Sequence, residues 1–140
     1  MGLLSDMAAG SEQRLAAARA VVSDAELRMR CAALPPLPRL RLSAEGFDLI
    51  AELKLRSPAL GDLSARTMNP VARLRDYAEA GAAICSVLTE PSRFDGDLSH
   101  LRQAATTLAP YGVPAMRKDF LVDPYQVLEA RVNGAGGVLL

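Results

Sequence analysis

Glu52 and Lys54 are the residues of this sequence whose types and spacing first suggest chemistry. They lie two positions apart in an apolar segment that has the pattern of a buried strand ending in a loop. Because side chains alternate between the two faces of a strand, the carboxylate and the ammonium group point the same way. Leu49, Ala51 and Leu53 then form an apolar opposite face. A buried charge costs several kcal/mol unless paired, so a protein that retains such a pair usually uses it.

Two further apolar segments also end in polar groups. The run 82–88 leads into a threonine and a glutamate, and the run 113–116 leads into an Arg-Lys-Asp triplet that contains Lys118. Polar chemistry gathered at the carboxyl ends of parallel strands is how α/β barrels and open sheets build active sites. We therefore expect Glu52, Lys54 and Lys118 to converge at one end of a sheet.

Strands and helices are expected to alternate from residue 48 onward. The expected strands lie near 48–54, 83–88, 114–118 and 137–140. Between them, helical stretches begin at Asn69-Pro70, near Leu98 and at Asp123-Pro124. This alternation predicts right-handed βαβ units and a parallel α/β sheet. A complete (β/α)8 TIM barrel needs roughly 200–250 residues, so we expect about its first four strands, with an unpaired edge at the last one.

The first 46 residues are expected to form a helical extension ahead of the barrel half. An alanine-rich stretch over about 11–22 precedes a capping-box pattern at Ser23-Asp-Ala-Glu26. The proline-rich segment 34–38 then breaks the helix and is typical of a linker. The expected division is therefore a helical extension over 1–46 and the first half of a barrel over 47–140.

Composition argues against several functional classes. Sixteen basic and sixteen acidic residues cancel, which argues against a nucleic-acid binder that relies on bulk charge. No apolar run reaches membrane-spanning length, and the first ten residues lack a signal-peptide pattern. Cys31 and Cys85 stand apart, with no CxxC or Cys/His cluster. Reduced packing thiols in a cytoplasmic protein are expected, and a metal site is not.

Several motifs together resemble the indole-3-glycerol phosphate synthase family. They fall in order over residues 48–140 and follow successive strands of its barrel, which is of the ribulose-phosphate-binding type. The matching segments are Ala51-Glu-Leu-Lys54 with Ser57-Pro58 and Gly61, Ser86-Val-Leu-Thr-Glu90 with Phe94-Asp-Gly96, Arg117-Lys-Asp-Phe120 with Asp123-Pro-Tyr-Gln126, and Gly134-Ala135 with Leu139-Leu140. The helical leader resembles the family's N-terminal extension only loosely.

The resemblance implies a carbon–carbon lyase, specifically a carboxy-lyase. Members of the family convert 1-(2-carboxyphenylamino)-1-deoxyribulose 5-phosphate into indole-3-glycerol phosphate, carbon dioxide and water. The reaction belongs to tryptophan biosynthesis and uses no cofactor or metal, so the implied partner is a small phosphorylated substrate.

The resemblance also implies catalytic roles. Lys118 would be the general acid that protonates the keto oxygen of the substrate while the aromatic ring attacks, and a neighbouring cation with partial burial can lower a lysine pKa toward the working range. Lys54 would face the substrate carboxylate and hold the ring in attack geometry. Glu52 would orient Lys54 and accept hydrogen bonds from substrate hydroxyls.

Further positions are implied to bind substrate or to depart from the family. Ser57 would help to bind substrate, and Phe94 and Phe120 would line an aromatic pocket. Leu55 stands where many relatives have a second basic residue, and Gly136 where an aspartate is usual. The resemblance places the general base on the following strand and the phosphate loops after strands seven and eight, so we expect this chain alone to be inactive.

Alternatives of other classes stay open at this point. The chain could be a catalytically silent half-barrel that acts as an assembly or interaction module, with self-association through its open sheet edge. Another barrel enzyme acting on a phosphorylated sugar, such as an isomerase, is disfavoured by the paired Glu-x-Lys and Arg-Lys-Asp-Phe motifs. Glu52 and Lys54 could also be a structural ion pair, and Phe94 and Phe120 simple core residues.

Overall fold

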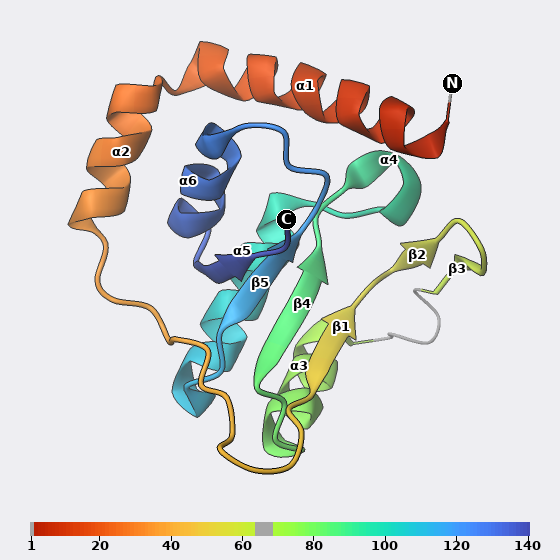
Figure 1. Ribbon diagram of the computed structural model, residues 1–140, viewed down its shortest axis with the longest axis vertical. Helices are drawn as coiled ribbons and strands as arrows, with labels where there is room; N and C mark the ends of the chain where they lie inside the picture. The colour runs from red at the N-terminus through yellow and green to blue at the C-terminus, as the bar shows by residue number, and fades with distance from the viewer. Residues whose placement is uncertain (1, 64–68) are drawn as a thin grey trace.

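The computed structural model describes residues 2–63 and 69–140 and consists of two N-terminal helices followed by alternating strands and helices (Figure 1). The helices are α1 (Leu3–Val21), α2 (Asp24–Ala33), α3 (Pro70–Glu79), α4 (Pro91–Phe94), α5 (Leu98–Leu108) and α6 (Pro124–Val132), with a 3-10 turn at Ala109–Tyr111. The strands are β1 (Ile50–Leu53), β2 (Arg56–Ser57), β3 (Gly61–Asp62), β4 (Ile84–Leu88), β5 (Ala115–Lys118) and β6 (Ala135–Val138).

Four strands form a parallel sheet in the order β1-β4-β5-β6, which confirms the predicted α/β arrangement. The register pairs Glu52 with Ser86 and Leu88 with Lys118. Because side chains alternate between faces along each strand, these four residues lie on the same face of the sheet. β2 and β3 form a small separate antiparallel pair in the loop after β1.

The last strand begins two residues earlier than the expected 137–140. Gly134 adopts a positive φ of 89°, a conformation that glycine reaches without steric cost, and ends the helical segment there. The chain then enters β6 directly at Ala135. The register shifts within this pair, because Ala115 pairs with Ala135 and Met116 with Gly137, which leaves Gly136 between the paired positions.

Side-chain caps explain where the helices begin. Asn69 accepts a hydrogen bond from the backbone N–H of Ala72 at 3.0 Å, and Asp123 accepts one from Tyr125 at 2.8 Å. Each precedes a proline at the first helical position, where the missing N–H has no intrahelical role. Ser23 caps α2 by accepting a hydrogen bond from the backbone N–H of Glu26 at 3.2 Å, with Asp24 rather than a proline at the first helical position. The helix starts expected from the sequence at these residues are therefore confirmed.

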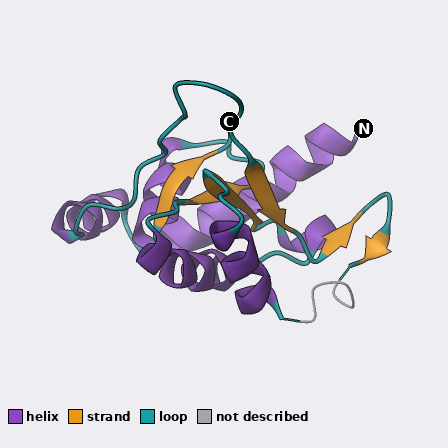
Figure 2. Cartoon of the chain, turned by 90° about the horizontal axis from the view of Figure 1, so that it is seen from below, coloured by secondary structure: helices purple, strands orange, loops and turns teal. Residues whose placement is uncertain are grey.

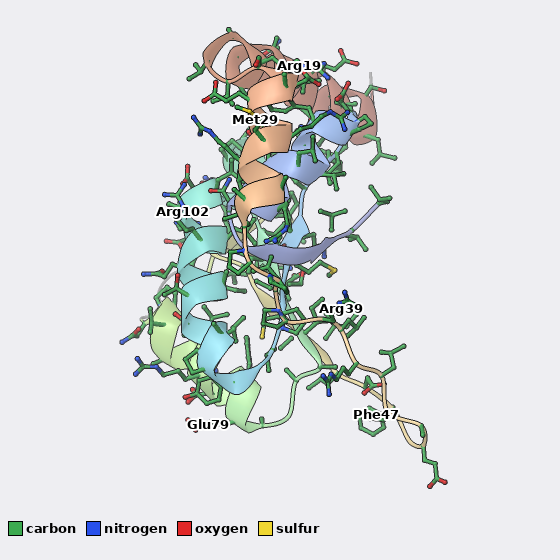
Figure 3. All side chains as sticks on the ribbon, turned by 90° about the vertical axis from the view of Figure 1, so that its left-hand side faces the viewer. Arg19, Met29, Arg39, Phe47, Glu79 and Arg102 are labelled. Atoms are coloured by element: carbon green, nitrogen blue, oxygen red, sulfur yellow. The ribbon has the colours of Figure 1, made fainter. Side chains whose placement is uncertain are left out.

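The N-terminal helices end sooner than the expected helical extension. Residues 34–49 form no helix or strand, because three prolines within 34–38 lack N–H donors and disfavour helical dihedrals in the residues before them. Figure 3 shows Arg39 and Phe47 along this segment, and Phe47 is 86% exposed. The division into an extension over 1–46 and a barrel half over 47–140 stays a prediction.

α1 lies across the carboxyl ends of β4 and β5, and α2 packs beside α6 (Figure 1). The Tyr125 hydroxyl donates to the Val22 carbonyl at 2.9 Å, and Gln126 Nε2 donates to Ser11 Oγ at 2.8 Å. The Arg19 guanidinium also stacks 5.3 Å from the centroid of the Tyr125 ring. None of the described helices is both long and apolar enough to cross a membrane.

The hydrophobic core lies between one face of the sheet and the helices α3, α5 and α6. In the view from below, the helices nearest the viewer lie along one side of the strands (Figure 2). Ala51 and Leu53 join this core as expected, whereas Leu49, placed before β1, is 51% exposed. Cys85 is fully buried there, and this burial raises the pKa of its thiol to about 11, so it behaves as a packing residue.

Candidate active site

Glu52, Lys54 and Lys118 come together at the carboxyl end of the sheet. Glu52 lies within β1, Lys54 directly follows that strand, and Lys118 is the last residue of β5. Lys54 Nζ lies 3.1 Å from Glu52 Oε1, and Lys118 Nζ donates to Glu52 Oε2 at 2.5 Å. One carboxylate therefore holds two ammonium groups that are 64 residues apart in the sequence.

These three side chains are partly exposed, and each of them is ion-paired. Their exposed fractions are 27% for Glu52, 30% for Lys54 and 38% for Lys118. Burial acts to raise the pKa of Glu52, but the hydrogen bonds and charges of Lys118 and Lys54 outweigh it, so the pKa lies below the ordinary value of 4.5. The carboxylate is therefore ionised at neutral pH and keeps both cations in place.

Lysine is rare in this chain, and the two lysines that it contains, Lys54 and Lys118, both belong to this cluster. Two of its sixteen basic residues are lysines, and the others are arginines. The two side chains are not equivalent, because an ammonium group is a compact charge that can exchange its proton, whereas a guanidinium group stays protonated. Lysine at these two positions fits a site where a proton is transferred or a single carboxylate is held.

A cavity of about 180 Å³ opens beside the cluster, and we call it the site cavity. A cavity of roughly 150 Å³ is sufficient for a benzene-sized molecule, so this one has room for an aromatic ring. Its lining residues are Glu52, Lys54, Leu88, Phe94, Lys118, Asp119, Phe120 and Leu139. The structure thus brings five of the six predicted site residues together around one cavity.

Ser57 is the predicted site residue that lies outside the site cavity. It is buried in β2, and its hydroxyl accepts a hydrogen bond from the backbone N–H of Ala59 at 3.3 Å. Sequence reasoning also missed Leu88, Asp119 and Leu139 as lining residues. The signal for Leu88 is its parity, since it pairs with Lys118 in register and so shares a face with it.

The loop after β4 carries Phe94 and is held against the end of that strand. The Glu90 carboxylate is fully buried and accepts hydrogen bonds from the backbone N–H groups of Ser92 at 2.9 Å and Arg93 at 2.7 Å. Gly96 closes the loop, because a Cβ there would lie 2.6 Å from the Leu88 carbonyl oxygen. Glu90, to which the sequence assigns no role, thus positions α4 and its phenylalanine.

A dense polar network lies on the opposite side of β5 from the site cluster. Arg117, 3% exposed, donates from Nη1 to Glu129 at 2.8 Å and from Nη2 to Asp119 at 3.1 Å. Thr89 donates to the same Asp119 oxygen at 2.8 Å. The charges of this network are buried and paired, so we interpret it as a structural network that stabilises the fold.

Gly136, where the motif resemblance leads us to expect an aspartate, has little room for a side chain. A Cβ at this position would lie 2.7 Å from the Pro38 carbonyl oxygen and 2.9 Å from Pro114 Cβ. The linker between α2 and β1 therefore occupies the space that an aspartate side chain would need.

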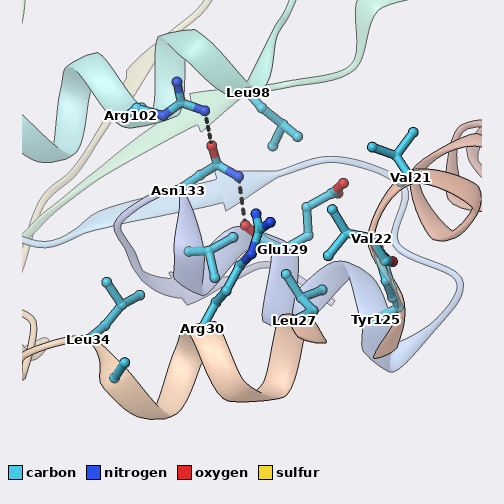
Figure 4. A pocket seen from close by; sticks show the side chains of 13 residues that line it. Val21, Val22, Leu27, Arg30, Leu34, Leu98, Arg102, Tyr125, Glu129 and Asn133 are labelled. Carbon is cyan, nitrogen blue, oxygen red and sulfur yellow. Dashed lines mark hydrogen bonds between the residues drawn. The ribbon is translucent and has the colours of Figure 1, made fainter. Parts of the chain in front are cut away.

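The largest of the cavities described here lies on the outer surface, between the N-terminal helices and α5 and α6. It has a volume of about 720 Å³ and mostly apolar walls, which include Leu27 and Tyr125 (Figure 4). Arg102 donates to the Asn133 side-chain oxygen at 2.8 Å at its rim. None of the predicted site residues lines this cavity. Within residues 2–63 and 69–140, no group of three or more His, Cys, Asp or Glu side chains could hold a metal ion.

Comparisons with known proteins agree with the motif resemblance. The family model for indole-3-glycerol phosphate synthase matches residues 4–140. The chain is 44% identical to the indole-3-glycerol phosphate synthase of a Nocardioides species, covering 100% of this chain and 53% of that protein. It is 43% identical to the protein of that name from Saccharopolyspora erythraea, covering 100% and 51%, and 39% identical to that from Mycobacterium avium, covering 99% and 50%.

The chain thus spans about half the length of the curated relatives it matches. These matches do not favour the isomerase or assembly-module alternatives, because the curated relatives named above carry the synthase name. The parallel sheet, with helices between its strands, agrees with the barrel fold of the family. The chain therefore belongs to the indole-3-glycerol phosphate synthase family of (β/α)8 barrels.

Proposed function

We propose that this chain supplies Lys118, Lys54 and Glu52 to the active site of an indole-3-glycerol phosphate synthase. The substrate is 1-(2-carboxyphenylamino)-1-deoxyribulose 5-phosphate, and the products are indole-3-glycerol phosphate, carbon dioxide and water. The observation that supports this most is the pairing of both lysines with one carboxylate, beside a cavity that is walled by Phe94 and Phe120.

Lys118 is the proposed general acid for ring closure. The ring carbon that bears the carboxylate attacks the keto carbon, and the electron pair of the C=O bond moves onto oxygen. A proton from the Lys118 ammonium group neutralises the developing alkoxide. Loss of carbon dioxide returns an electron pair to the ring. Loss of the new hydroxyl together with a proton from the adjacent methylene carbon, as water, then forms the C=C bond of the indole. Proton donation in the transition state contributes about 10²–10⁴-fold in rate.

Lys54 and Glu52 are proposed to hold the substrate in attack geometry. An ammonium group beside the cavity can pair with the substrate carboxylate and orient the ring toward the keto carbon. Glu52 contacts both lysines, so it sets the distance between the carboxylate holder and the acid. Its remaining lone pairs can accept hydrogen bonds from the sugar hydroxyls.

Phe94 and Phe120 are proposed to enclose the aromatic ring of the substrate. Both line the site cavity, and aromatic side chains favour offset or edge-to-face contacts with a bound ring. A substrate-binding role for Ser57 rests on the family motif alone. Its hydroxyl would have to turn from the Ala59 amide toward the substrate.

The direct test is a synthase assay on the protein expressed from its complete reading frame. We expect fluorescent indole product from the wild type, and a loss of about 10²–10⁴-fold in kcat with a much smaller change in KM for Lys118→Ala. Arg56→Ala is the matched control, because Arg56 forms an exposed ion pair with Asp95 at 3.4 Å and does not line the site cavity as it is described over residues 2–63 and 69–140. Absence of product from the wild type, or an unchanged kcat in Lys118→Ala, would refute the proposal.

A further inference from the structure

Asp119 is the residue that separates the site cavity from a second cavity beneath α1. This second cavity, which we call the helix cavity, has a volume of about 280 Å³ and is lined by Arg14, Thr89, Arg117 and Asp119 among others. Asp119 lines both cavities, whereas Lys118 and Phe120, its neighbours in sequence, line only the site cavity. Any shift of Asp119 therefore moves the backbone that carries two proposed site residues.

The Asp119 carboxylate is held by four donors on its two oxygens. Oδ1 accepts from Arg14 Nη2 and from the Phe120 backbone N–H, each at 2.8 Å. Oδ2 accepts from Thr89 Oγ1 at 2.8 Å and from Arg117 Nη2 at 3.1 Å. The side chain is 1% exposed, so a carboxylate with this many donors in a place with little water has a single strongly preferred position.

One of these donors comes from a distant part of the chain. Arg14 lies on α1, 105 residues before Asp119, and its side chain is 29% exposed. The other donors lie on β5 or directly follow β4 or β5. Arg14 is therefore the α1 residue that contacts this carboxylate and couples α1 directly to the end of β5.

We propose that Asp119 and Arg14 are positioning residues: the buried carboxylate fixes the backbone between Lys118 and Phe120, and α1 holds that carboxylate in place through Arg14. The inference rests on the proposed function, since it concerns the geometry of the proposed general acid. The Asp119 carboxylate is already held by four donors, so the proposed role of both residues is positioning rather than proton transfer. They set where the Lys118 ammonium group stands relative to the ring held by Phe120, and small misplacements of reacting groups are costly in rate.

The test compares Arg14→Gln with Arg19→Gln in the protein expressed from its complete reading frame. Arg19 is a matched control, because it lies on the same helix and also reaches the segment after β5, through Asp123 at 2.7 Å. Two quantities are measured: the hydrogen-exchange rate of the Phe120 amide by NMR, and kcat with KM in the synthase assay. Asp119→Asn and the double variant Arg14→Gln with Asp119→Asn complete a double-mutant cycle.

We expect Arg14→Gln to raise the exchange rate of the Phe120 amide about tenfold and to lower kcat about tenfold, with KM changed less than about threefold. Arg19→Gln should leave both quantities unchanged even where it lowers the melting temperature. The double variant should lie close to Asp119→Asn, because the charged 2.8 Å contact between Arg14 and Asp119 is lost in both. The other contact of Arg14, with Glu90 at 3.5 Å, is longer and should add little. If Asp119→Asn does not fold, the Arg14→Gln comparison still decides.

The proposal is wrong if Arg14→Gln behaves like Arg19→Gln in both measurements. It is also wrong if Arg14→Gln lowers only the melting temperature, because a purely structural contact would do that. If the wild type makes no indole product, the proposed function fails. The Phe120 exchange rate then still decides whether α1 fixes the end of β5.

Discussion

The two faces of β5 differ in how far their charged side chains are buried and in how many partners they have. Lys118 faces the site cavity, with a side chain 38% exposed and Glu52 as its partner. Arg117, one residue earlier, is 3% exposed and donates to Thr89, Gln126, Glu129 and Asp119. One strand thus carries a half-open charge cluster on one side and a closed, fully paired network on the other.

This difference in burial and pairing distinguishes side chains that can exchange partners, such as Lys118, from side chains that hold the strand in place, such as Arg117. A buried charge with several strong partners is expensive to move or to discharge, which suits a fixed frame. A partly solvated ammonium group that shares one carboxylate with another can exchange partners when a substrate arrives. We infer that the frame side of β5 sets stability, whereas the cavity side sets activity.

Arg117→Met should give the largest loss of stability. It removes the buried cation that Asp119 and Glu129 share and leaves Asp119 with Arg14 as its remaining cation, so we expect the free energy of unfolding to fall by about 3–5 kcal/mol. Denaturant unfolding followed by circular dichroism measures this. Arg56→Met is the control, because its pair with Asp95 is exposed and should contribute less than about 1 kcal/mol. Equal losses in the two variants would contradict the frame role.

Gly96→Ala should give the next largest effect, because it disturbs the loop that carries Phe94. The new methyl group would lie 2.6 Å from backbone atoms of Leu88 and Thr89, so we expect a loss of about 1–3 kcal/mol. Gly10→Ala is the matched control, since its new methyl would meet only Arg14 Nη1, at 3.7 Å, within α1. There alanine should stabilise the helix by about 0.5–1 kcal/mol. Thermal unfolding of both variants gives the comparison, and a neutral Gly96→Ala would show that the loop is not held as described.

Lys54→Met should change stability by less than about 1 kcal/mol, because its ion pair with Glu52 is partly solvated. A loss of more than about 3 kcal/mol would instead identify Glu52 and Lys54 as a structural ion pair. The same denaturant experiment decides between the two, with Arg117→Met as the reference for a frame residue.

The smallest effect should be a shift of pH dependence. Because hydrogen bonds from both lysines lower the pKa of Glu52, its stabilising contribution is fully present above the ordinary value of 4.5 and is lost as the pH falls through the lowered pKa. In Lys118→Met the main opposing hydrogen bond disappears while burial remains, so the Glu52 pKa should rise. Carbon-13 NMR titration of the Glu52 carboxyl group in the wild type and in Lys118→Met measures the two pKa values. An unchanged pKa would show that Lys118 does not hold this carboxylate.

Local signals predicted much of the fold. Alternating apolar runs and capped helix starts at Asn69 and Asp123 depend on neighbours in the sequence, so they could be recognised without the structure. The meeting of Glu52 with Lys118 followed from the rule that parallel strands end at one edge. The predicted helix ends and the predicted start of β6 were less accurate, because a glycine or a proline can end a helix one or two positions away from its own place in the sequence.

Long-range contacts could not be predicted in the same way. Arg14 reaches Asp119 across 105 residues, and no spacing in the sequence signals that pairing. The linker carbonyl that excludes a side chain at Gly136 is equally remote in sequence. Ser57 has the expected motif neighbours, yet local pairing of β2 with β3 turns its hydroxyl toward Ala59. Such features depend on tertiary packing, which motif spacing does not encode.

Lys118→Met separates reactivity from stability most directly when kcat and the free energy of unfolding are determined on the same preparation. We predict that turnover falls at least about a hundredfold, while stability changes by less than about 1 kcal/mol, because the side chain is partly exposed and its proposed role is proton donation to the substrate. Wild-type turnover in this variant, or a loss of stability as large as that of Arg117→Met, would contradict the division of labour across β5.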